Sequence, residues 1–183
     1  EYNHTVAQLL MTGSDFENEE RHINFKNTMD KLLEFKALPI INENDTVATE
    51  EIKVGDNDTL SALVSSMVGA DLLILLSDID GLYTDDPHTN PDAQLVKEVE
   101  NLDQDILGMA KGTTGSNVGT GGMTTKLTAA KIATLSGTDM IIANGADVKV
   151  ISDIFADDYT GTLFHSNKNA NFNLATYIME TIG

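Results

Sequence analysis

The chain has 183 residues, of which 41% are hydrophobic and 22% are charged, as expected of one folded domain. Its net charge of −18 disfavours nucleic acids and anionic membranes as partners, because binding to either depends on Lys and Arg. No apolar run approaches the roughly 20 residues that cross a bilayer, and the N-terminus shows no signal-peptide pattern, so we expect a cytoplasmic protein.

Helices and strands are predicted to alternate along the chain. Apolar spacing and capping residues predict helices over 18–35, 58–68, 102–109, 124–136, 148–155 and 172–182. Short apolar runs predict strands over 37–42, 71–78, 139–144 and 161–165. Asp58 or Thr59 is the expected N-cap of the second helix, and Gly69 is its expected end. This order predicts an α/β fold with a mostly parallel sheet.

Polar residues follow three of the predicted strands, at 42–45, 77–78 and 144–145. Ligands of open α/β sheets bind beyond the carboxyl ends of strands, so we expect these three ends to line one crevice. The segment 42–58 is especially rich in acids and amides: Asn42, Glu43, Asn44, Asp45, Asp56, Asn57 and Asp58. Turns and helix caps also favour such residues, but their density after a strand favours a site for a small charged ligand.

The segment 111–122 contains five glycines and directly precedes a predicted helix. Such a loop can turn its backbone N–H groups toward phosphate oxygens, and the helix adds its positive end. Lys126 would supply a mobile positive charge beside this loop. The pattern is not that of a P-loop, and composition alone fits a surface loop equally well.

Metal and thiol chemistry have little support in the residue pattern. Cysteine is absent, which excludes disulfides and thiolate catalysis. The four histidines are scattered without ligand spacing, so we predict no protein metal site.

Five motifs in this chain resemble those of the glutamate 5-kinases, a branch of the amino acid kinase family. They lie at 41–45 (INEND), 51–58 (EIKVGDND), 80–84 (DGLYT), 119–126 (GTGGMTTK) and 161–164 (GTLF). The resemblance runs from about residue 6 to residue 165. It implies a three-layer αβα sandwich with a central, mainly parallel sheet.

The resemblance also implies a reaction and the residues that perform it. The reaction is phosphoryl transfer from ATP, with Mg²⁺, to the γ-carboxylate of L-glutamate, the first step of proline biosynthesis. Lys126 and Asp58 would be catalytic, with Lys126 stabilising the transferred phosphoryl group and Asp58 orienting lysines. Substrate-binding residues would be Asp45, Asn57 and Asn42. Nucleotide-binding residues would be Ser77, Asp78, Thr120, Gly121, Gly122, Met123, Thr124, Thr125 and Lys126.

Family members are commonly oligomeric and inhibited by proline, so we expect a homo-oligomer and a possible proline effect. Compared with the family, this chain lacks the N-terminal strand with its catalytic lysine and Gly-Ser loop, and we expect no C-terminal PUA domain. We therefore expect residues 1–183 to be an N-terminally incomplete kinase domain that contacts nucleotide but turns over glutamate poorly or not at all. Alternatives are an acetylglutamate, carbamate or uridylate kinase-like enzyme, or a non-catalytic nucleotide-binding fragment.

Overall fold

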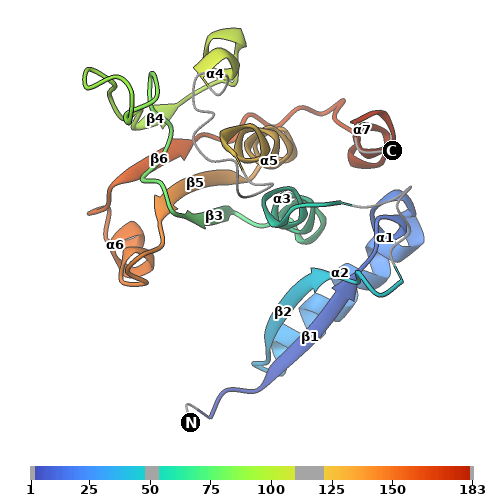
Figure 1. Ribbon diagram of the computed structural model, residues 1–183. Helices are drawn as coiled ribbons and strands as arrows, with labels where there is room; N and C mark the ends of the chain where they lie inside the picture. The colour runs from blue at the N-terminus through green and yellow to red at the C-terminus, as the bar shows by residue number, and fades with distance from the viewer. Residues whose placement is uncertain (1–2, 48–53, 110–121, 182–183) are drawn as a thin grey trace.

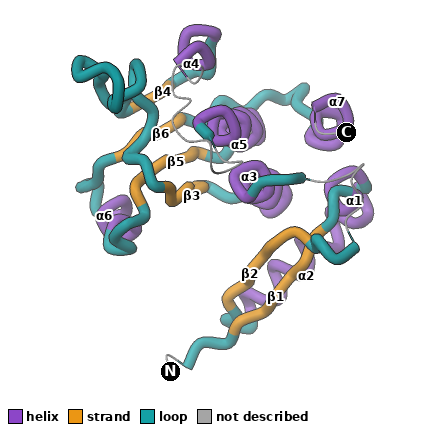
Figure 2. Tube along the Cα trace, viewed as in Figure 1, coloured by secondary structure: helices purple, strands orange, loops and turns teal. Residues whose placement is uncertain are grey.

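The computed structural model describes residues 3–47, 54–109 and 122–181, and Figure 1 shows their arrangement. Among these residues the strands form two sheets, one of two strands and one of four. The helices pack beside both sheets, as the purple coils of Figure 2 show. None of the helices in the described ranges is long and apolar enough to span a membrane.

The two-stranded sheet pairs β1 (Val6–Met11) in parallel with β2 (Leu38–Glu43). Between them lie the short α1 (Ser14–Glu17) and the longer α2 (Glu19–Glu34), which begins where the Asn18 side chain accepts a hydrogen bond from the Arg21 N–H. The helix predicted over 18–35 and the strand over 37–42 are thereby confirmed, whereas β1 and α1 were not predicted. Large apolar side chains remain exposed on both strands: Val6, Leu10, Leu38 and Ile40.

The four-stranded sheet has the order β3-β5-β6-β4. Its members are β3 (Leu72–Ser77), β5 (Asp139–Asn144), β6 (Gly161–Phe164) and β4 (Glu98–Val99). The β3–β5 and β4–β6 pairs are parallel, and the β5–β6 pair is antiparallel. The sheet is therefore mainly parallel, as the alternation of helices and strands predicted.

Alternating side chains of β5 face two different helical layers. Met140 and Ile142 are fully buried in the larger core, together with residues of α3 (Asn57–Val68) and α5 (Met123–Ser136). Ile141 and Ala143 instead pack with Ile154 of α6 (Val150–Phe155) in a second core cluster. Since successive strand residues point to opposite faces, this sheet lies between two helical layers, which confirms the αβα sandwich (Figure 1).

The remaining helices are α4 (Gln104–Met109) and α7 (Leu174–Thr181), close to their predicted positions. One predicted detail was wrong, namely the N-cap of α3. Asp56, in extended backbone conformation, accepts a hydrogen bond from the Thr59 N–H at 2.7 Å, and so caps the helix that contains Asp58. Gly69 ends α3 at φ 68°, as predicted, because glycine adopts this left-handed conformation without steric cost.

Candidate functional site

The first turns of α3 and α5 meet through their side chains. The Asp58 Oδ2 atom accepts hydrogen bonds from Lys126 Nζ at 3.1 Å and from Thr125 Oγ1 at 2.8 Å. The two catalytic residues expected from the sequence are thus in direct contact, although 68 positions separate them. Because Asp56 caps α3, the Asp58 carboxylate is available for this contact.

Lys126 is more buried than the sequence suggested. It is 6% exposed, whereas the sequence predicted a mobile positive charge. The helix that carries it is buried along most of its length by its small and aliphatic side chains, among them Leu127, Ala129, Ala130, Ile132 and Ala133. A buried ammonium is stable only with a partner, and Asp58 provides that partner.

The N-terminus of α5 is suited to an anion. Gly122 occupies the N-cap position and has no side chain with which to bond the first N–H groups of the helix. Unbonded N–H groups and the helix dipole make such a terminus favourable for phosphate. Thr124 is exposed there, whereas Met123 is buried beneath it. Thr120 and Gly121, together with most of the predicted glycine loop, lie outside the described residues.

Glu43, at the end of β2, ties that strand to the start of α3. Its carboxylate accepts hydrogen bonds from the backbone N–H groups of Val54 at 2.8 Å and Gly55 at 3.3 Å. This contact brings the two parts of the polar segment 42–58 together, as the sequence suggested. The sequence pattern placed Glu43 in this cluster without a role, because its partners are backbone N–H groups, which no residue type marks.

The three residues predicted to bind the substrate lie on either side of this Glu43 contact. Asn42 and Asp45 belong to or follow β2, Asn57 begins α3, and all three are exposed. Asn42 directly precedes Glu43 in β2, so its side chain points to the opposite face of the strand, whereas Asn57 follows Gly55 by two positions. The Glu43 contact thus brings the end of β2 close to the start of α3, and the assignment of these three residues to the substrate stays a prediction.

A second polar cluster lies at the ends of β3 and β5. Ser77 pairs in register with Asn144, and Ser77 Oγ donates to Asp78 Oδ1 at 3.1 Å. The Asn144 side-chain amide donates to Asp80 Oδ1 at 2.9 Å, and Tyr83 Oη donates to the other oxygen of Asp80 at 3.2 Å. Partial burial, and then the Asp80 charge, raise the pKa of Tyr83, so this phenol stays protonated.

Only two of the three strand ends that were predicted to line one crevice belong to the same sheet. The ends of β3 and β5 lie side by side, as expected from the order of the strands. The end of β2 belongs to the separate two-stranded sheet, because its hydrogen-bonded neighbour is β1. Sequence order alone cannot distinguish one sheet from two.

The sequence model of the amino acid kinase family matches residues 1–144. The chain is 52% identical over 168 residues to the protein named glutamate 5-kinase of Clostridium tetani, covering 92% of this chain and 62% of that protein. It is 51% identical over 172 residues to the protein of the same name from Clostridium perfringens, with 92% and 64% coverage. Against the one from Proteus mirabilis it is 50% identical over 168 residues, with 92% and 46% coverage. The chain thus spans roughly half to two thirds of these relatives' lengths.

Solved structures agree on the fold. A UMP kinase from Ureaplasma parvum superposes with a TM-score of 0.54 at 16% identity, covering 76% of this chain and 52% of that one. A carbamate kinase from Giardia lamblia superposes with a TM-score of 0.55 at 18% identity, covering 78% and 49%. Such identities bear on the fold alone. With its family match over most of its length, and with an αβα sandwich that solved kinases share, the chain belongs to the amino acid kinase family.

Proposed function

We propose that this chain forms the nucleotide-binding portion, and part of the glutamate-binding portion, of an ATP-dependent L-glutamate 5-kinase acting in proline biosynthesis. The observation that carries the proposal is the buried Lys126–Asp58 pair at the joined N-termini of α3 and α5. The names of the relatives, each about half identical to this chain, support the choice of glutamate.

The chemistry of this reaction needs charge neutralisation more than proton transfer. A glutamate side chain has an ordinary pKa near 4.3 and is therefore an ionised nucleophile at neutral pH. It must approach the γ-phosphate of ATP, which is also an anion, in line with the breaking bond. The Lys126 ammonium and the N–H groups at the start of α5 would stabilise the negative charge on the transferred group.

Asp58 would act by holding Lys126 in place. Its Oδ2 atom binds both Lys126 and Thr125, so the ammonium is oriented before the nucleotide arrives. Mg²⁺ would supply further charge neutralisation between the phosphates of ATP. Protein sites for ATP-bound Mg²⁺ use one or two carboxylates, and Asp58 has the donor chemistry for that part.

The substrates are assigned to the two polar clusters. Asp45 is proposed to pair with the ammonium group of glutamate, and Asn57 and Asn42 to bond its α-carboxylate end. Ser77 and Asp78 are proposed to contact the nucleotide, with Thr120 to Thr125 following its phosphates. The support is the Glu43 contact, which joins the first cluster to the helix that carries Asp58.

The proposed partners beyond ATP and glutamate are proline, as an inhibitor, and further copies of this chain. The exposed apolar residues of β1 and β2 support self-association, because buried contacts would remove them from water. A cytoplasmic location remains our prediction.

The test measures ATP binding and ADP release separately, with glutamate, acetylglutamate, carbamate and UMP as acceptors, and with proline added. We expect glutamate to be the preferred acceptor wherever turnover occurs. Lys126→Met should lower turnover by about 100-fold or more, as expected for a group that stabilises transition-state charge. Lys131→Met is the matched control, because it removes the same charge from an exposed position of the same helix.

Each outcome decides a different part of the proposal. Preference for another acceptor would contradict the glutamate assignment and favour one of the other amino acid kinase activities. Equal losses in Lys126→Met and Lys131→Met would contradict the role of Lys126. ATP binding without turnover of any acceptor would favour a non-catalytic nucleotide-binding fragment.

A further inference from the structure

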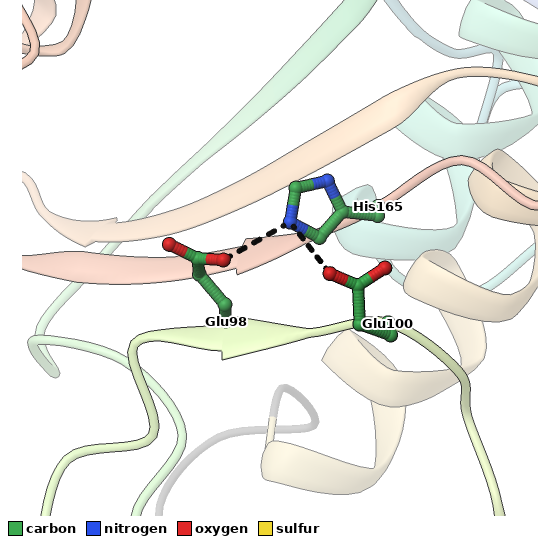
Figure 3. A group of neighbouring side chains, drawn as sticks. All are labelled: Glu98, Glu100 and His165. Atoms are coloured by element: carbon green, nitrogen blue, oxygen red, sulfur yellow. Dashed lines mark hydrogen bonds and ion pairs between the residues drawn. The ribbon is translucent and has the colours of Figure 1, made fainter.

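We propose that Glu98, Glu100 and His165 form a binding site for a divalent transition-metal ion of the zinc class. This site lies at the edge strand of the larger sheet, away from the Lys126–Asp58 pair, and the inference is independent of the proposed function. Figure 3 shows the three side chains converging, with Glu98 on β4, Glu100 just after β4 and His165 just after β6. One ligand atom from each lies within 4.8 Å of the other two.

The backbone holds these residues in this arrangement. Glu98 and Glu100 flank the buried Val99, so strand alternation directs both carboxylates to the same face. The His165 N–H donates to the Val99 carbonyl at 3.0 Å, and the Leu163 N–H donates to the Lys97 carbonyl at 2.8 Å. The parallel pairing of β4 with β6 therefore places the histidine between the two glutamates, and the side chains need little rearrangement to share an ion.

The distances between the side chains are compatible with ligands that share one metal ion. His165 Nε2 lies 3.4 Å from Glu98 Oε2 and 3.6 Å from Glu100 Oε1. These separations exceed the 2.7–3.2 Å typical of hydrogen bonds between nitrogen and oxygen. Two ligand atoms that each lie about 2.1 Å from a zinc ion, at the tetrahedral angle, are about 3.4 Å apart. The two spacings from His165 to the glutamates are thus close to those of ligands around one ion, and the two carboxylates lie within 4.8 Å of each other.

The surroundings leave room for the rest of a coordination shell. Glu100 and His165 line a cavity of about 150 Å³, which is also lined by the amides Asn101 and Asn167. Water could therefore complete the coordination, since three protein ligands leave at least one position open. Lys131 also lines the cavity and carries a positive charge. Its ammonium group is placed over the Tyr177 ring, 5.4 Å from the ring centre.

The ligand types favour zinc-like ions over magnesium. An imidazole nitrogen with two carboxylates suits Zn²⁺, Co²⁺ or Mn²⁺, whereas Mg²⁺ prefers oxygen ligands alone. Bound here, the ion would join β4, a strand of two residues at the edge of the sheet, to β6. The sequence pattern did not predict this site, because His165 and Glu98 are 67 positions apart and show no ligand spacing.

The experiment titrates Zn²⁺ into untagged, metal-free protein by calorimetry and records the visible absorption of the Co²⁺ form. We expect one ion per chain, with Co²⁺ bands typical of mixed nitrogen and oxygen ligands. Glu98→Gln, Glu100→Gln and His165→Asn should each weaken binding by about tenfold or more, because even partners outside the coordination shell contribute 10–100-fold. Both glutamates are exposed, so their variants should fold normally.

His88→Asn is the control, because His88 is exposed in a loop beside Asp85 and Asp86 yet belongs to no three-ligand group among the described residues. It should bind Zn²⁺ as the unaltered chain does. Absence of Zn²⁺ binding, or equal binding by all variants, would overturn the proposed site. Displacement of Zn²⁺ by Mg²⁺ at similar concentration would overturn the choice of a zinc-class ion.

Discussion

Removing Asp58 should destabilise the protein more than removing Lys126. The two residues form one ion pair, with side-chain exposures of 20% for Asp58 and 7% for Lys126. Their positions in their helices differ in electrostatic effect, however. Asp58 lies in the first turn of α3, where the helix dipole favours an anion, whereas Lys126 lies in the first turn of α5, where it disfavours a cation. Lys126 thus depends on Asp58 more than Asp58 depends on Lys126.

The structure permits an estimate of the difference. Breaking a buried pair costs about 3–5 kcal/mol, and the partial exposure of Asp58 lowers this to about 2–4 kcal/mol for Asp58→Ala. Lys126→Met keeps the aliphatic packing and leaves Asp58 bonded to Thr125, so its cost should be about 1 kcal/mol or less. The double variant buries no charge and should be more stable than Asp58→Ala alone, by about 1–2 kcal/mol.

The assay is urea unfolding followed by circular dichroism, with all three variants measured under the same buffer conditions. For a chain of this size, each kcal/mol should also shift the melting temperature by about 2–4 °C. If Lys126→Met costs as much as Asp58→Ala, or if the double variant is no more stable than Asp58→Ala, the reasoning from the helix dipoles is wrong.

Three further predictions concern stability. The fully buried Thr162 hydroxyl accepts a hydrogen bond from the Leu82 N–H at 2.8 Å and donates one to the Val96 carbonyl at 2.6 Å. Thr162→Val should therefore lower the free energy of unfolding in urea by about 1–3 kcal/mol, and a Thr162→Ser variant that costs as much would contradict this hydrogen-bond argument. Gly161→Ala should lower the free energy of unfolding by about 1–3 kcal/mol, since the added Cβ would lie 2.7 Å from the Ile142 carbonyl oxygen. The control Gly108→Ala should be neutral or stabilising, because an added Cβ there meets no atom within 4 Å. Burial lowers the pKa of His22, and the Glu19 charge partly opposes this shift. The unfolded chain therefore binds a proton at His22 more readily than the folded chain, so the contribution of this residue to stability should fall as the pH drops below about 6.5. His22→Leu should flatten that dependence, and an unchanged pH profile of unfolding would refute it.

The helices and strands were largely predictable because their signals are local. The spacing of apolar residues over 18–35 and the glycine at 69 predicted the extent of α2 and the end of α3. The strand β1 was missed because Gln8 interrupts its apolar run, and its pairing with β2, 32 positions away in register, leaves no local signal. The N-cap of α3 was misplaced because all four residues 56–59 are of types that can serve as caps, and backbone conformation alone selects Asp56.

What the sequence determined by itself was the αβ order of elements, the polar ends of β3 and β5, and the choice of Lys126 and Asp58 as chemical candidates. Only the tertiary structure decided that these two residues touch, that Lys126 is buried, and that Glu43 ties β2 to α3. The convergence of Glu98, Glu100 and His165 was likewise visible only after folding. The physical reason is the same throughout: local patterns depend on neighbours within a few residues, whereas contacts between side chains depend on how helices and sheets pack across tens of residues.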